Sequence, residues 1–154
     1  MSDEVERSPD SLPHAVLCVD DDAAVLSALR RLLRDESFEV LTASNAAHAL
    51  ASLRRNAVEV IISDQRMPGQ SGAELLAEVG QRWPRIGRVI LTGFPGPNVL
   101  SEGIRAGVDF LFQKPWDDDA LKSAVLRLIR RKQRREASAE EMEEVQYDLG
   151  GEGG

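Results

Sequence analysis

Residues 15–22 read Ala-Val-Leu-Cys-Val-Asp-Asp-Asp, a short apolar run that ends in three consecutive carboxylates. Such a run, bounded by polar residues, is typical of a buried strand. Four more runs of this kind follow, and segments with the helical spacing of apolar residues separate them. The five expected strands cover residues 15–19, 38–41, 58–62, 86–91 and 108–112.

This alternation of strands and helices predicts an α/β fold, a doubly wound five-stranded parallel sheet with helices on both faces. The helical spacing is clearest over 25–33 and 121–129. The fourth helix is expected to be short and mobile, because Pro-Gly-Pro at 95–97 delays its start and Gly103 lies in its interior. The expected N-caps of the other helices are Asp22, Ser44 or Asn45, Ser71 or Gln70, and Asp117.

The ends of the expected strands carry the residues with chemical potential. In doubly wound sheets, ligands bind beyond the carboxyl ends of the strands. The first strand ends in Asp20 and Asp21, the third in Asp64 and the fourth in Thr92, and the fifth runs to Lys114. We therefore expect carboxylates, a hydroxyl and an ammonium group to meet at one edge of the sheet.

Carboxylates at neighbouring strand ends repel each other unless a cation lies between them. Oxygen ligands favour a hard ion such as Mg²⁺, and a carboxylate beside it can attack a phosphoryl group to form an aspartyl phosphate. A metal, a lysine and a hydroxyl group would stabilise the charge on the transferring group. Asp21, Asp64, Thr92 and Lys114 supply this set, and Asp20 is a further acid that could orient metal-bound water.

These residues resemble a known family, the receiver domains of two-component response regulators. The resemblance runs from about residue 14 to 131. It implies the flavodoxin-like receiver fold for this part of the chain. Four motifs in the same order carry it: Val19-Asp20-Asp21-Asp22, Ser63-Asp64-Gln65-Arg66-Met67-Pro68-Gly69, Leu91-Thr92-Gly93 and Lys114-Pro115-Trp116.

The resemblance implies a role for each matching residue. Asp64 would accept the phosphoryl group from a histidine kinase. Mg²⁺ would be held by Asp21, Asp64 and the backbone carbonyl of Arg66, with Asp20 as the further acid of the metal site. Lys114 would pair with the acyl phosphate, and Thr92 would bind a phosphoryl oxygen. The bond from Lys114 to Pro115 would be cis, which proline makes possible.

One position departs from the family pattern. Receivers usually carry Tyr or Phe three residues before the lysine, where its inward swing reports phosphorylation, but this chain has Leu111. Phe110 and Phe112 flank it and are expected to point to the other face of the sheet. How Asp64 is coupled to the fourth helix and fifth strand is therefore left open by the sequence.

Arg66 and Phe94 lie two residues beyond Asp64 and Thr92. By resemblance, side chains at these positions overhang the acyl phosphate and restrict attacking water. We therefore expect slow self-dephosphorylation and no enzymatic turnover of a diffusible substrate.

Length and charge set the wider expectations. The chain has 154 residues and a formal net charge of −7, which predicts one domain at 14–131 with polar tails at 1–13 and 132–154, the second tail partly helical. No signal or spanning segment is evident, so the cytoplasm is expected. Direct DNA binding is not expected, because only 130–135 forms a basic cluster and an acidic run follows it.

Two other functions fit parts of the pattern. A haloacid-dehalogenase-type phosphatase also uses a strand-end aspartate, but its Asp-x-Asp motif would fall on Asp20 and Asp22 with Ala24 where Thr or Val is usual. A receiver-like scaffold that binds partners without phosphorylation is the more serious rival. The intact set of Asp64, Thr92 and Lys114 argues against it.

The expected partners follow from the receiver resemblance. They are a sensor histidine kinase or a phosphotransfer protein upstream, and an unidentified protein downstream. A homodimer through the fourth helix, fifth strand and fifth helix is a further expectation. With no output domain in the sequence, a stand-alone receiver that signals by protein contacts is the favoured interpretation.

Overall fold

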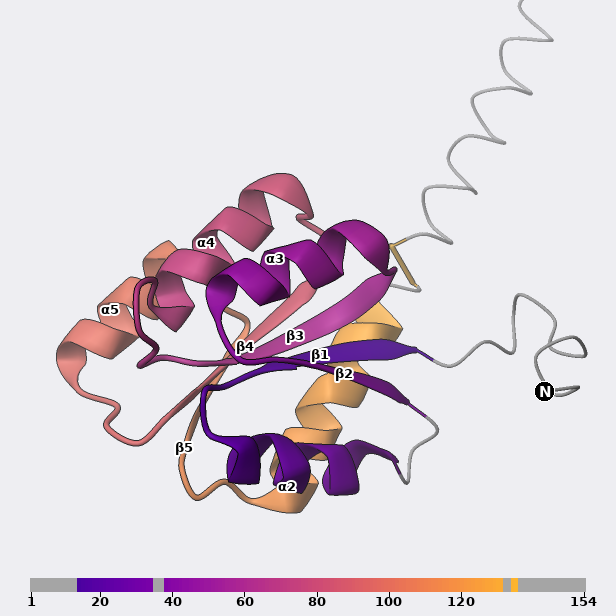
Figure 1. The fold of residues 1–154 in the computed structure, drawn as a ribbon, viewed down its shortest axis with the longest axis horizontal. Coiled ribbons are helices and arrows are strands. Elements are labelled where there is room, and N and C mark those ends of the chain that lie inside the picture. Colours follow the sequence, from indigo (N-terminus) through magenta and orange to yellow (C-terminus); the bar gives the residue numbers. More distant parts are fainter. Residues whose placement is uncertain (1–13, 35–37, 132–133, 136–154) are drawn as a thin grey trace, which may run out of the picture.

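The structure is a computed structural model that describes residues 14–34, 38–131 and 134–135. Its five parallel strands form one sheet in the order β2-β1-β3-β4-β5 (Figure 1). The strands are β1 Ala15–Val19, β2 Glu39–Ala43, β3 Val58–Asp64, β4 Gly87–Thr92 and β5 Phe110–Gln113. The helices are α2 Ala23–Arg34, α3 Ala46–Arg55, α4 Gly72–Arg82, α5 Pro97–Arg105 and a last helix at 118–131. The predicted fold class is confirmed.

Helices cover both faces of the sheet. Figure 1 shows α3, α4 and α5 on one face and α2 with the last helix on the other. Side chains of β1 alternate between the two cores, with Leu17 on the α3–α4 side and Val16 and Cys18 on the α2 side. Burial raises the pKa of the Cys18 thiol to about 12, so this cysteine is an unreactive part of the core.

The helix starts resolve the alternatives left by the sequence. Asp22 caps α2 by accepting a hydrogen bond from the Ala24 backbone N–H at 2.9 Å. Asn45, rather than the preceding serine, caps α3. Ser71 caps α4 in a capping box with Glu74, and Asp117 caps the last helix.

Some strand boundaries differ from those expected. β5 begins at Phe110 rather than at residue 108, because the chain is still turning there. Gly107 has a φ of 72°, and Asp109 Oδ2 accepts a hydrogen bond from the Arg88 backbone N–H at 2.8 Å. β2 also lies later in the sequence than expected, at Glu39–Ala43 instead of 38–41, and its last residue, Ala43, pairs with the end of β1.

Helix α5 is held less firmly than its neighbours. It has nine residues, its N-cap Gly96 makes no side-chain cap hydrogen bond, and Gly103 is its buried residue. Leu100 and Ile104 are 48% and 78% exposed. The predicted short length is confirmed, and the predicted mobility stays a prediction.

The two predicted tails fall almost wholly outside the described residues. Within the described part of the chain, none of the helices is both long enough and apolar enough to span a membrane.

Candidate functional site

Three carboxylates meet where β1 and β3 end. Val19 pairs with Ser63 across these strands, so the next residues, Asp20 and Asp64, lie side by side. One carboxylate oxygen from each of Asp20, Asp21 and Asp64 lies within 4.8 Å of the others. Asp20 and Asp64 are buried, and Asp21 is exposed to solvent. The predicted convergence of these acids is therefore present in the structure.

A lysine from the far edge of the sheet reaches the two buried acids. Lys114 follows β5, and its Nζ lies 2.9 Å from Asp20 Oδ2 and 3.2 Å from Asp64 Oδ1. Its backbone N–H donates a hydrogen bond to the Thr92 carbonyl at 2.8 Å, which aligns it with the end of β4. The bond from Lys114 to Pro115 is cis, as the resemblance implied.

Burial and neighbouring charges have opposing effects on the pKa values of Asp64 and Lys114. Burial raises the pKa of the Asp64 carboxyl, and the neighbouring Asp20 carboxylate raises it further. Lys114 and the backbone N–H of Arg66 oppose this rise by hydrogen bonding to the Asp64 carboxylate. Burial lowers the pKa of Lys114, but the two carboxylates outweigh that effect and the net pKa is raised. Asp64 is thus a buried acid whose charge is only partly balanced.

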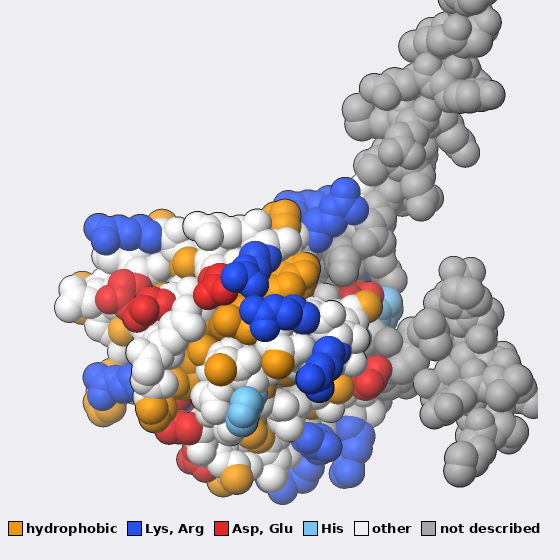
Figure 2. Space-filling view, turned by 45° about the horizontal axis from the view of Figure 1, so that its top comes forward, with side chains coloured by type: hydrophobic (Ala, Val, Ile, Leu, Met, Phe, Trp, Pro, Cys, Tyr) orange, Lys and Arg blue, Asp and Glu red, His pale blue; other side chains and the backbone are white. Residues whose placement is uncertain are grey.

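The donor set of this site fits a small hard cation. All the grouped ligands are carboxylate oxygens, and one of them is open to solvent for entry of an ion. In Figure 2, acidic side chains at the end of the molecule that carries the strand carboxyl ends lie beside Lys or Arg side chains, and both signs of charge also occur toward the opposite end. The predicted part of the Arg66 carbonyl as a metal ligand stays a prediction.

Thr92 lies one strand further along the edge. It is the last residue of β4, directly after Leu91, which pairs with Asp64. The side chain is 1% exposed, and its Oγ1 accepts a hydrogen bond from the Phe94 backbone N–H at 3.2 Å. Its hydroxyl proton is therefore available to another acceptor at this edge.

Arg66 and Phe94 contact each other above these strand ends. The Arg66 Cζ lies 4.9 Å from the centre of the Phe94 ring, a cation–π arrangement. Phe94 is otherwise 67% exposed. The contact joins the loop after β3 to the loop after β4. The predicted covering role of these two residues stays a prediction.

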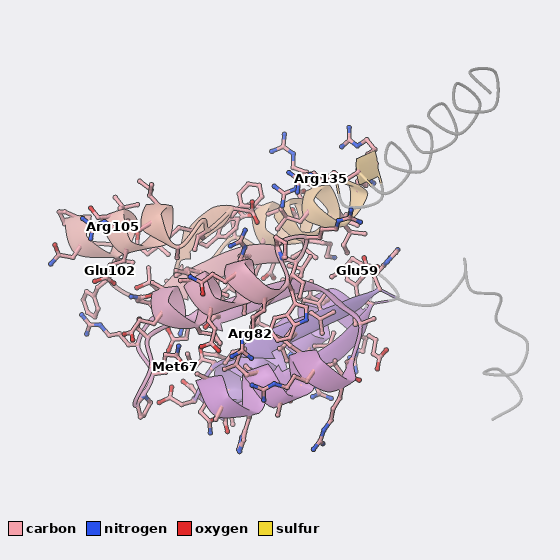
Figure 3. The ribbon with its side chains drawn as sticks, turned by 90° about the horizontal axis from the view of Figure 1, so that it is seen from above. Glu59, Met67, Arg82, Glu102, Arg105 and Arg135 are labelled. Atoms are coloured by element: carbon pink, nitrogen blue, oxygen red, sulfur yellow. The ribbon has the colours of Figure 1, made fainter. Side chains whose placement is uncertain are left out.

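Sequence reasoning missed Gln65, which follows Asp64 directly. This buried amide accepts a hydrogen bond from the Ala73 backbone N–H through Oε1 and donates to Glu102 Oε2 through Nε2, both at 2.9 Å. A polar residue at the end of a buried strand is a signal that could have been noticed, but its partner is 37 positions away. Figure 3 shows Glu102 at the same end of the molecule as Met67, away from Glu59.

The expected orientation of the fifth strand is confirmed. Leu111 packs with the core under α3 and α4, whereas Phe110 and Phe112 pack with the core under α2 and the last helix. The two phenylalanine rings stack with their centres 6.2 Å apart. No aromatic side chain of β5 is therefore available on the face where receivers usually carry one.

Curated relatives match this chain along its described domain. The hydrogenase transcriptional regulatory protein HoxA of Cupriavidus necator is 44% identical over 115 residues, which cover 74% of this chain and 24% of that protein. The transcriptional regulatory protein FixJ of Azorhizobium caulinodans is 35% identical over 117 residues, 76% of this chain and 54% of FixJ. The chain spans only about a quarter of the length of the hydrogenase regulators.

Solved structures match the same region. The signal receiver domain of an HD domain-containing protein from Pseudomonas fluorescens has a TM-score of 0.77 and 28% identity, covering 79% of this chain and 98% of that one. A response regulator receiver domain from Clostridium thermocellum has a TM-score of 0.73 and 30% identity, covering 78% and 97%. The family model of the response regulator receiver domain matches residues 16–126, and the chain belongs to this family.

Proposed function

We propose that this chain is a phosphoryl-accepting receiver in which Asp64 is the acceptor. The observation that carries the proposal is the buried Asp64 carboxylate beside Asp20, with the Lys114 ammonium group in contact with both. A buried pair of like charges with one shared cation is costly for a purely structural role. Membership of the receiver family supports the same assignment.

Asp20, Asp21 and Asp64 would hold Mg²⁺ at this edge. When bound, the ion would neutralise the carboxylates and bind an oxygen of the incoming phosphoryl group. An Asp64 oxygen attacks phosphorus, and the bond from phosphorus to the donor breaks, so that the donor leaves with the bonding electron pair. Lys114 then pairs with the acyl phosphate, and the Thr92 hydroxyl donates to a phosphoryl oxygen.

The proposal also covers the setting of this chemistry. A sensor histidine kinase or a phosphotransfer protein would supply the phosphoryl group, and the domain would pass the signal on by contacts with another protein. It would act in the cytoplasm, without direct DNA binding and without turnover of a diffusible substrate. The names of HoxA and FixJ describe transcriptional regulators, but the matched region covers only 24% of HoxA and 54% of FixJ.

The metal site can be tested by thermal unfolding. Mg²⁺ should raise the unfolding midpoint of the wild-type protein, because a free concentration of 100 times the dissociation constant adds about 2.7 kcal/mol to the free energy of unfolding. Asp64→Asn should lose this response. Without Mg²⁺ the variant should unfold at a higher temperature than wild type, because the raised pKa of Asp64 means that its ionised form costs folding free energy at neutral pH.

Asp22→Asn is the matched control, since an asparagine retains the capping function of this exposed residue. It should respond to Mg²⁺ as the wild type does. A wild-type protein whose midpoint is the same with and without Mg²⁺ would contradict the proposed metal site.

Phosphorylation can be tested with a small donor. Incubation with acetyl phosphate and Mg²⁺ should add the mass of one phosphoryl group to the wild type and to Asp22→Asn, with release of acetate. Asp64→Asn should gain none, because it lacks the attacking carboxylate. Intact-protein mass spectrometry measures the result, and an unmodified wild type would favour the phosphorylation-independent scaffold.

The lifetime of the phosphorylated form should depend on the Arg66–Phe94 contact. Replacing both residues by alanine removes the stacked pair and should speed the loss of the phosphoryl group severalfold, because water reaches the acyl phosphate more easily. The decay is followed by mass spectrometry after the donor is removed. Asn98→Ala, an exposed change on α5, should decay at the wild-type rate, and equal rates for all three proteins would refute the covering role.

Self-association is proposed through α5, β5 and the last helix. The exposed Leu100 and Ile104 side chains support a second copy as the partner of this surface. With beryllofluoride and Mg²⁺, light scattering should show a dimer for the wild type and for Ser27→Lys, an exposed change on α2. Ile104→Lys should stay monomeric, and a monomeric wild type would exclude this part of the proposal.

A further inference from the structure

We propose that Gln65 is a positioning residue that couples Asp64 to α5 through its hydrogen bond to Glu102. The inference rests on the proposed phosphorylation of Asp64 and names how the rest of the domain responds to it. The bond is formed while Asp64 is a free carboxylate and weakens when Asp64 is phosphorylated. Its loss releases α5 from the loop that follows β3.

The first support is the way Gln65 is held. Its backbone N–H donates to the Leu91 carbonyl at 3.2 Å, and its carbonyl accepts from the Gly72 N–H at 3.0 Å. Its side-chain oxygen accepts from the Ala73 N–H at 2.9 Å. Both ends of the residue are therefore tied to the ends of β3 and β4 and to the start of α4. A displacement of Asp64 would be passed directly to the amide nitrogen.

The second support is the way α5 is held. Gln65 Nε2 donates to Glu102 Oε2 and joins α5 to the loop after β3, while at the other end of the helix Arg88 Nη1 donates to the carbonyl of the C-cap residue Ala106 at 3.1 Å. The helix also lacks a side-chain cap and buries little of its surface. Because few contacts hold α5, the loss of one charge-assisted hydrogen bond should shift the helix or make its backbone hydrogen bonds open more often.

The third support is space for movement. A groove of about 370 Å³ lies between α4 and α5, and Glu102 and Arg105 line it on the α5 side. Figure 3 shows Glu102 and Arg105 on neighbouring parts of α5. Ser71, Ala73 and Glu74 line the groove on the α4 side. The groove therefore leaves open space beside α5 on the side that faces α4.

The fourth support is the residue at the usual aromatic position. Leu111 has no polar group, and a methyl group added at Gly103 would lie 3.9 Å from its Cδ1, an ordinary packing distance. Leu111 thus offers α5 an apolar contact but no hydrogen bond. Glu102 and Gln65 provide the polar, distance-sensitive connection on this face.

The test measures thermodynamic linkage in the whole chain with beryllofluoride and Mg²⁺ as the probe. If the bond is stronger without the phosphoryl group, removing it must favour the phosphorylated arrangement. Glu102→Ala should then bind beryllofluoride at least about 5-fold more tightly than wild type by titration calorimetry. Glu102→Gln retains an acceptor oxygen and should stay close to wild type. Ser101→Ala, the exposed neighbour, should be unchanged.

Hydrogen exchange supplies the second readout. At a protein concentration low enough to keep the wild type monomeric, beryllofluoride should speed exchange of the α5 backbone amides. In Glu102→Ala these amides should exchange fast before the probe is added, while amides of α2 should be unaffected. A purely local structural role for the bond would raise α5 exchange without changing the affinity for the probe.

The possible results separate the two proposals. If the wild type binds the probe and Glu102→Ala binds it with equal or lower affinity, the coupling is wrong and the receiver function stands. If the wild type does not bind the probe at all, the proposed phosphorylation of Asp64 is wrong and the coupling falls with it. Tighter binding by Glu102→Ala together with fast α5 exchange supports both.

Discussion

Two carboxylates buried side by side impose the main physical constraint on this domain. Asp20 and Asp64 come from neighbouring strands, repel each other and have lost much of their hydration. The cation that the chain itself provides is Lys114, which follows a strand at the edge of the sheet. The parallel arrangement of the strands brings these groups together, because only in a parallel sheet do the carboxyl ends of all strands meet at one edge.

Much of this arrangement could be predicted from the sequence. Each apolar run that leads to Asp20, Asp64 or Thr92 is short and continuous, which is the pattern of a strand buried on both faces. Once the strands are parallel, the residue after each run is placed at the same edge whatever the details of the loops. The helix caps were also predictable, since Asp22 and Ser71 satisfy backbone donors within their own first turn.

The rest depends on contacts between distant parts of the chain. Gln65 and Glu102 are 37 positions apart, and no local pattern predicts that a glutamine amide will meet that carboxylate. The start of β5 differs from the expected one for a similar reason. The Asp109 side chain accepts a hydrogen bond from the Arg88 backbone N–H before the strand begins at Phe110. The stacking of Arg66 on Phe94 likewise joins two loops whose approach is set by the sheet.

The difference between α4 and α5 decides which helix can respond to Asp64. Helix α4 has a capping box at its start and buries Leu75, Leu76 and Val79, so a small shift of the strand ends leaves most of its contacts intact. Helix α5 depends on apolar packing over Leu111, on the Gln65–Glu102 hydrogen bond and, at its C-cap, on the hydrogen bond from Arg88 Nη1 to the Ala106 carbonyl. Packing changes gradually with distance, whereas a hydrogen bond weakens steeply as its geometry departs from the optimum. A polar connection therefore makes α5 more sensitive to the state of Asp64 than a leucine alone would.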